Sequence, residues 1–180
     1  MRAVVAYESM YGNTRKVADA IAKGLRESGE ASVVSIPEAT AEVVAAADLL
    51  VVGGPTHVHG LSRQSTREAA VQAADKEGSV LHLEPEVQGD GVREWLVGLA
   101  PGSGRAAAFD TRIRINPLLS GRASKRIARA LRRHGFELIA PAESFLVTNE
   151  SVLVEGEEDR AVEWGRSLGK VLAPVRVGGS

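Results

Sequence analysis

A short polar segment, Ser9-Met10-Tyr11-Gly12-Asn13-Thr14, has the residue types of an anion-binding loop. It connects an apolar run at residues 3–7 to a stretch with helical periodicity. The first backbone N–H groups of a helix have no partners within it, and the helix dipole favours negative charge there. Gly12 allows an unusual backbone angle or a close approach of a ligand. The segment therefore predicts a phosphate site, and an ordinary helix cap made by Asn13 or Thr14 is the alternative.

Two further polar segments follow apolar runs. Gly53-Gly54-Pro55-Thr56-His57-Val58-His59-Gly60 comes after the run 49–52, which is typical of a strand buried on both faces. Asp110-Thr111-Arg112 ends a short apolar strand at 106–109, whose last residue is Phe109. We expect both segments to form loops at strand ends. Their imidazole, carboxylate and guanidinium groups can line a ligand or bond its polar edge, and solvated loop residues are the alternative.

The elements that position these segments alternate along the chain. Apolar runs predict strands at 3–7, 31–36, 48–52 and 106–109, and a final strand at 136–139 and 144–147 that is interrupted at Pro141. Apolar periodicity predicts helices after each strand, including 65–74, 92–99, 117–134 and 157–172. Five alternations predict a three-layer α/β domain with a five-stranded parallel sheet. Ligands of such sheets bind beyond the carboxyl ends of the strands, where all three polar segments meet.

Composition and charge exclude several kinds of site and give no support for others. The 180 residues carry a formal net charge of −1 and contain no cysteine, which excludes disulfides, thiolate metal sites and Fe–S clusters. The near-neutral charge gives no general reason to expect nucleic acid or membrane as a partner, and the basic helix at 122–133 is interpreted as a solvated face. No signal peptide or membrane-spanning run is found, so a cytoplasmic protein is expected. We expect one domain over 1–174 and a frayed tail at 175–180.

The chain resembles the flavodoxin-like FMN-binding family in three places. Ser9 to Thr14 are similar to its phosphate loop, and Gly53-Gly54-Pro55-Thr56-His57 are similar to its second flavin loop. Phe109-Asp110-Thr111-Arg112 stand where its third flavin loop belongs. The resemblance implies a doubly wound sandwich with strand order 2-1-3-4-5, an extended loop and helix insertion after strand three, and non-covalently bound FMN. The residues it implies at the cofactor are Ser9, Met10, Tyr11, Gly12, Asn13, Thr14, Pro55, Thr56, His57, Val58, His59, Gly60, Phe109, Asp110, Thr111 and Arg112.

The ring end departs from the family's usual pattern. His57 and His59 stand where an aromatic wall is usual, and no aromatic residue occurs between Asp110 and Asn116. These histidines are interpreted as a flavin wall. Ordinary polar loop residues are the alternative, and metal ligands a weaker one, because other candidate ligands such as His82 and Asp110 show no recognisable spacing. Residues 61–90 exceed the usual loop length, which is typical of a lid or a dimer contact.

Three functions follow from these features. The first is an FMN-binding redox protein that transfers electrons to a partner protein. The second is an NAD(P)H-dependent flavin or quinone reductase, which histidines and Arg112 near the ring would suit by raising the reduction potential. The weakest is a metal-dependent hydrolase using His57 and His59. A monomer or a homodimer is compatible with each of them.

Overall fold

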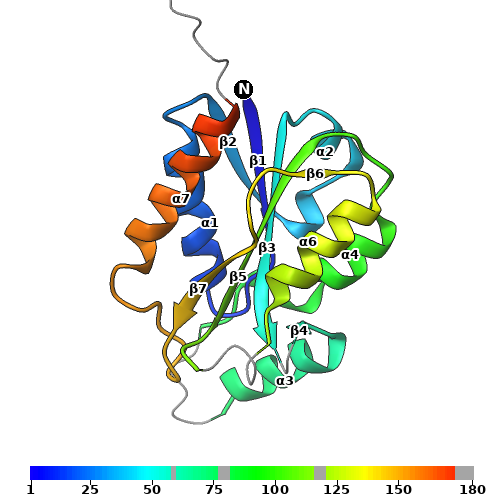
Figure 1. The fold of residues 1–180 in the computed structure, drawn as a ribbon. Helices are drawn as coiled ribbons and strands as arrows, with labels where there is room; N and C mark the ends of the chain where they lie inside the picture. Colours follow the sequence, from blue (N-terminus) through cyan, green and yellow to red (C-terminus); the bar gives the residue numbers. More distant parts are fainter. Residues whose placement is uncertain (58–59, 77–81, 116–120, 173–180) are drawn as a thin grey trace, which may run out of the picture.

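The computed structural model describes residues 1–57, 60–76, 82–115 and 121–172. Strands and helices alternate along the chain, and Figure 1 shows the helices packed on both sides of a twisted sheet. The strands are β1 (Arg2–Tyr7), β2 (Glu30–Ser35), β3 (Leu49–His57), β4 (Gly60–Leu61), β5 (Arg105–Ile113), β6 (Glu137–Leu138) and β7 (Glu143–Val147). The helices are α1 (Asn13–Leu25), α2 (Ala41–Ala45), α3 (Gln64–Ala74), α4 (Val92–Gly98), α6 (Ala123–Arg133) and α7 (Glu157–Leu172), with short 3₁₀ turns η1 (Ile36–Glu38) and η2 (Pro85–Gln88).

The main sheet confirms the predicted parallel topology. Its order is β2-β1-β3-β5-β6, and each of these neighbouring pairs is parallel. β7 also pairs in parallel with β5, further along that strand than β6 does. β6 and β7 are therefore the two pieces of the predicted final strand, separated around Pro141, which has no N–H to donate to a ladder. Counted in this way, the order is 2-1-3-4-5.

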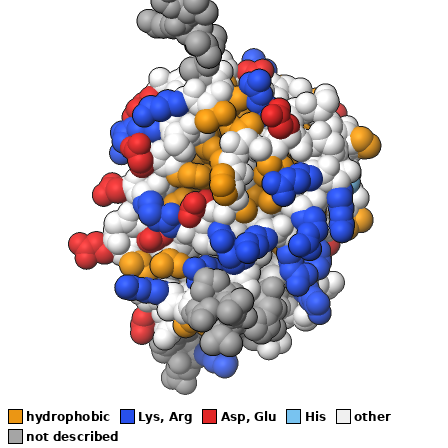
Figure 2. Space-filling view, in the orientation of Figure 1, with side chains coloured by type: hydrophobic (Ala, Val, Ile, Leu, Met, Phe, Trp, Pro, Cys, Tyr) orange, Lys and Arg blue, Asp and Glu red, His pale blue; other side chains and the backbone are white. Residues whose placement is uncertain are grey.

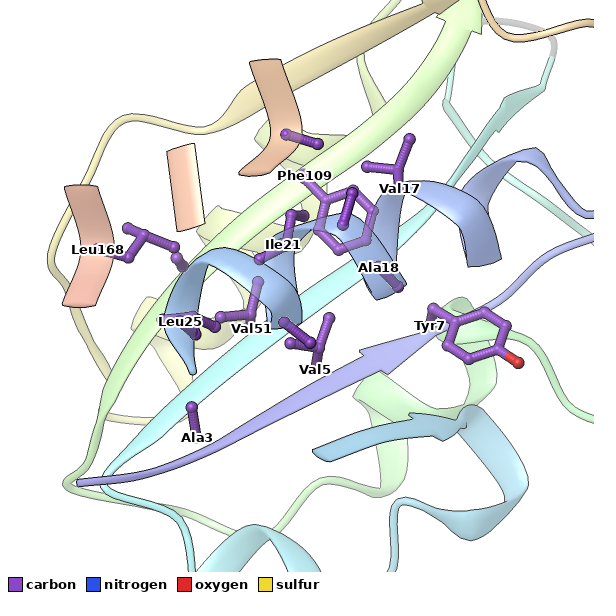
Figure 3. Close-up of a cluster of buried hydrophobic side chains, with 14 of the residues drawn as sticks. Ala3, Val5, Tyr7, Val17, Ala18, Ile21, Leu25, Val51, Phe109 and Leu168 are labelled. Carbon is purple, nitrogen blue, oxygen red and sulfur yellow. The ribbon is translucent and has the colours of Figure 1, made fainter. Parts of the chain in front are cut away.

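Alternation along the strands divides the core into two layers. Val5, Val51 and Phe109 face α1 and α7, whereas Val4 and Leu50 belong to the cluster under α4 and α6. Figure 3 shows Phe109 beside Val17 and Ile21 of α1, and Leu168 of α7 near Leu25 toward the other end of that helix. Both faces of the sheet are thus covered, as expected for strands that are apolar on both sides.

Helix α1 is held against α7 by two close backbone approaches. A Cβ atom on Gly24 would lie 2.0 Å from the carbonyl oxygen of Val162, and one on Gly165 would lie 2.2 Å from that of Ile21. Only glycine allows the helices to approach so closely. This packing fixes the axis of α1 and hence the position of its N-terminus at the carboxyl edge of the sheet.

Several predicted boundaries are wrong. The helix expected at 117–134 begins at Ala123, because Arg122 has extended backbone angles; residues 117–120 lie outside the described part of the chain. β3 and β5 continue through segments expected to be loops. They stay paired as far as Pro55 and Thr111, so Gly53, Gly54 and Pro55 do not end the strand.

Candidate functional site

Three predicted segments meet at one edge of the sheet. β1, β3 and β5 are parallel neighbours, with Tyr7 aligned to Gly53 and Gly53 aligned to Phe109. The residues that follow these positions therefore emerge side by side. The N-terminus of α1 lies at the same edge, directly after β1 (Figure 1).

The N-terminus of α1 presents free backbone donors. Gly12 caps the helix in the left-handed region, with φ of 83°, and its N–H donates to Ser9 Oγ at 3.1 Å. Among the residues that the structure describes, the N–H groups of Asn13, Thr14 and Arg15 have no acceptor, and no side chain caps the helix. Three free N–H groups at the positive end of a 13-residue helix suit an anion.

The side chains of this segment make internal contacts. Asn13 Nδ2 donates to the carbonyl oxygen of Ser151 at 2.6 Å, and the hydroxyl oxygens of Thr14 and Thr111 lie 2.8 Å apart. Met10 is buried, and the Tyr11 hydroxyl donates to the carbonyl oxygen of Ala70 at 3.4 Å. The Asn13 amide uses one of its two protons in this contact and keeps the other, so it can donate to an anion together with the backbone N–H groups.

The second segment forms the end of β3 and a paired return strand. Thr56 is aligned with Leu61 and His57 with Gly60 in an antiparallel ladder, and Val58 and His59 lie outside the described residues. Thr56 Oγ1 accepts from the backbone N–H of Ala123 at 2.9 Å. Burial lowers the pKa of His57 from its usual value, so its imidazole is neutral at pH 7.

The third segment is a strand end whose residues serve the fold. Phe109 is fully buried, with its ring stacked edge-on to Phe145 and Trp164 in the core. Asp110 is also fully buried, and its Oδ2 accepts from the backbone N–H of Ser124 in the first turn of α6 at 2.7 Å. Arg112 Nη1 donates to the carbonyl oxygens of Ile113 and Ile115. The expectation of a loop is therefore wrong, because β5 continues to Ile113, while contact of Phe109, Asp110 and Arg112 with the cofactor stays a prediction.

A buried polar cluster that the sequence analysis missed adjoins the phosphate loop. Glu8, one residue before Ser9, accepts from the Val92 N–H at 2.8 Å, while its Oε1 has no hydrogen-bond partner among the described residues. Buried Arg67 of α3 donates to Ser62 Oγ at 3.3 Å and to Glu94 Oε2 at 3.1 Å. Burial raises the pKa of Glu8. The alternation Val4, Ala6, Glu8 along β1 was the one sequence signal for an inward carboxylate.

A second missed residue, Glu84, lies against the first turn of α1. Its Oε2 is 3.2 Å from Arg15 Nη1, and its backbone N–H donates to the carbonyl oxygen of Met10 at 2.9 Å. Its Oε1 lies 3.2 Å from the point that a Cβ atom on Gly12 would occupy. No periodicity marks residues 82–91, so the sequence offered no local signal for this contact.

A large cavity lies away from the three predicted segments. About 950 Å³ of space opens between α2, α4 and residues 98–104, with Trp95, Leu99 and Phe136 in its lining. None of its lining residues belongs to the three predicted segments. A second, much smaller cavity of about 10 Å³ borders Tyr7, Glu8 and Ser9.

Outside the gaps at 58–59, 77–81, 116–120 and 173–180, no group of three or more His, Asp or Glu side chains is placed to hold a metal ion. None of the helices described is both long and apolar enough to cross a membrane.

Comparison with known proteins identifies the family. Residues 5–98, just over half of the 180-residue chain, match the family model described as Flavodoxin. The chain therefore belongs to the flavodoxin family, and FMN, the cofactor of that family, is its cofactor, as the sequence predicts. No curated protein matches the chain significantly.

Solved structures show the same fold. Flavodoxin 1 from Bacillus cereus has a TM-score of 0.66 at 19% identity, covering 96% of this chain and 100% of that one. A flavodoxin from the domain Archaea has a TM-score of 0.64 at 21% identity, covering 95% of this chain and 99% of that one. Rubredoxin oxygen:oxidoreductase from Desulfovibrio gigas has a TM-score of 0.63 at 20% identity, and 36% of its chain is covered by 95% of this one.

Proposed function

We propose that this protein transfers electrons through FMN to a partner protein, with the FMN phosphate held at the N-terminus of α1. The observation that carries the proposal is the set of three N–H groups, on Asn13, Thr14 and Arg15, that have no acceptor among the described residues. Asn13 and Thr14 belong to the segment that resembles the family's phosphate loop, and Arg15 follows it directly. FMN supplies the redox chemistry when bound, and the chain supplies binding, orientation and electrostatics.

In this proposal, backbone N–H groups provide most of the hydrogen bonds to the FMN phosphate. The N–H groups of residues 13–15 donate to the phosphate oxygens, and the dipole of α1 stabilises their negative charge. The Ser9 hydroxyl, which already accepts from the Gly12 N–H, keeps its own proton free to donate. The hydrogen bond between the Thr14 and Thr111 hydroxyls connects the first turn of α1 to β5.

At the ring end, His57 is the described side chain best suited to the proposed role. It is half-buried at the end of β3, and its lowered pKa makes it a neutral imidazole that hydrogen-bonds without adding charge. Gly60, its partner in the hairpin, lies against the Arg126 side chain, since a Cβ there would lie 2.8 Å from Arg126 Nε. Pro55, Thr56 and His57, which are each aligned with a residue of a neighbouring strand, form the described part of the proposed ring site next to Gly60.

The exposed face of α6 favours a protein partner with an acidic surface. Five cations stand on this face, and in the described part of the chain none of them forms an ion pair with a carboxylate. Figure 2 shows Lys and Arg side chains gathered over the region where Figure 1 places α6. Arg126 lies beside Gly60, so the positive face adjoins the proposed ring site. The five cations are Lys125, Arg126, Arg129, Arg132 and Arg133.

The experiment compares electron transfer with nicotinamide oxidation in the FMN-loaded protein. After chemical reduction, the protein should pass electrons faster to acidic plastocyanin than to basic cytochrome c at low ionic strength, and added salt should reduce the difference, since both acceptors have potentials well above that of a flavin. NADH and NADPH should be oxidised only at the rate seen with free FMN. Sustained NAD(P)H oxidation coupled to a quinone would instead identify a reductase and overturn the proposal.

A further inference from the structure

Residues 82–88, part of the insertion after β3, are packed onto the phosphate loop. The Glu84 N–H donates to the Met10 carbonyl, a main-chain bond between the insertion and the loop. Buried Met10 and Val87 form a small apolar cluster with Ala70 of α3, and Leu83 packs at its edge. The insertion therefore has a defined docking position on the loop.

This docking places a carboxylate at the positive end of α1. The Glu84 side chain is only 14% exposed, and it is paired with Arg15 through Oε2 at 3.2 Å. Its other oxygen lies 3.2 Å from the position of a Cβ on Gly12, the N-cap residue of α1. The Glu84 carboxylate thus lies next to both Gly12 and Arg15, at the N-terminus of α1.

A carboxylate and a phosphate in this region repel each other. A phosphate monoester carries a charge of about −1.5 to −2 at pH 7, and the interaction between close charges is strong where water is partly excluded. Arg15 is already paired with Glu84, so its single positive charge would be shared between two anions that carry more than two negative charges together. Binding of the phosphate is therefore expected to displace the Glu84 carboxylate or to be weakened by it.

We propose that Glu84 competes with the FMN phosphate for the N-terminus of α1, so that it lowers the affinity for FMN and makes the cofactor exchangeable. This inference rests on the phosphate site in the proposed function. The competition acts through the phosphate alone. Riboflavin, which has the same ring and ribityl chain without the phosphate, is not affected by Glu84.

The test measures dissociation constants of FMN and riboflavin by flavin fluorescence for the wild type, Glu84→Gln and Glu84→Ala. Both variants should bind FMN about five- to tenfold more tightly than the wild type, with unchanged affinity for riboflavin, and added salt should shrink the gain. Glu68→Gln, which removes an exposed carboxylate of α3 that contacts Gln64, is the matched control and should leave both affinities unchanged.

The possible results separate this inference from the proposed function. Tighter FMN binding in the Glu84 variants alone supports the inference, whether or not the wild type retains FMN. A wild type that prefers FMN over riboflavin, together with variants of unchanged FMN affinity, overturns the role of Glu84 and leaves the phosphate site standing. Equal gains for FMN and riboflavin also overturn it, since they indicate loosened packing of the insertion. Failure of every protein to bind either flavin overturns both proposals.

Discussion

The hydroxyl oxygens of Thr14 and Thr111 lie 2.8 Å apart in a buried contact between the first turn of α1 and the end of β5. One of these hydroxyls donates to the other, and both side chains are almost fully buried. The two residues are 97 positions apart in the sequence, and each belongs to a segment with family resemblance. The contact fixes the phosphate loop to the sheet.

A double-mutant cycle on this pair should show strong coupling. Thr14→Val and Thr111→Val each leave a buried hydroxyl without its partner and should lower the free energy of unfolding by about 1–2 kcal/mol. The double variant should lose much less than the sum of the two, because neither hydroxyl remains. Urea denaturation measures all four proteins. Strictly additive losses would show that the two hydroxyls do not depend on each other.

Gly53 should tolerate no side chain. A Cβ there would lie 2.1 Å from the Phe109 ring, which is fully buried and cannot move away, so Gly53→Ala should cost about 2 kcal/mol or more. Gly98→Ala is the matched control, because nothing lies within 4 Å of that Cβ at the end of α4. It should be neutral or stabilising by up to about 0.5 kcal/mol. Thermal unfolding of the two variants checks the contrast, and equal stabilities would contradict the packing described for Phe109.

Asp110 should matter for the stability of α6. Its Oδ2 accepts from the Ser124 N–H, so Asp110→Ala should cost about 1–2 kcal/mol, and Asp110→Asn, which keeps an acceptor in the same place, should cost much less. FMN affinity of Asp110→Asn should equal that of the wild type. A large loss of FMN affinity in this variant, with unfolding unchanged, would mean that Asp110 contacts the cofactor directly.

Glu8 should make stability fall as pH rises. Burial raises its pKa in the folded state above the ordinary value of 4.5, so the folded state holds the proton more tightly than the unfolded state. The free energy of unfolding of the wild type, relative to Glu8→Gln, should therefore decrease from pH 4.5 upward and level off above the raised pKa. Urea midpoints across this range measure the effect. His57 is present in both proteins, so its own titration cancels in the difference between them. If the stability of the wild type relative to Glu8→Gln instead rose with pH, the attraction of Arg67 for the Glu8 carboxylate would outweigh the effect of burial on the Glu8 pKa.

Much of the fold was predictable because its signals are local. Buried parallel strands are continuous apolar runs, such as 49–52, and the helices between them carry clear apolar faces. Pro141 marked the break in the final strand. The turn from β1 into α1 at residues 9–14 was predictable for the same reason, since a strand, a glycine and a helix start follow one another directly.

The internal contacts of the second and third segments could not be predicted, because they are made with residues far away in the sequence. In the sequence, Asp110 has the character of a polar loop residue. In the structure, its carboxylate accepts a hydrogen bond from the Ser124 N–H of α6, which lies 14 residues further along the chain. Phe109 follows three alanines, and only the absence of a side chain at Gly53, on the neighbouring strand, lets its ring lie in the core. Glu84 reaches α1 from an insertion without periodicity.

The central claim is that FMN binds through its phosphate at residues 9–14. Fluorescence titration of the wild-type protein with FMN and with riboflavin tests it most directly. FMN should bind at one site per chain and at least about tenfold more tightly than riboflavin, with inorganic phosphate competing against FMN only. Equal affinity for the two flavins, or no binding of FMN, would contradict it.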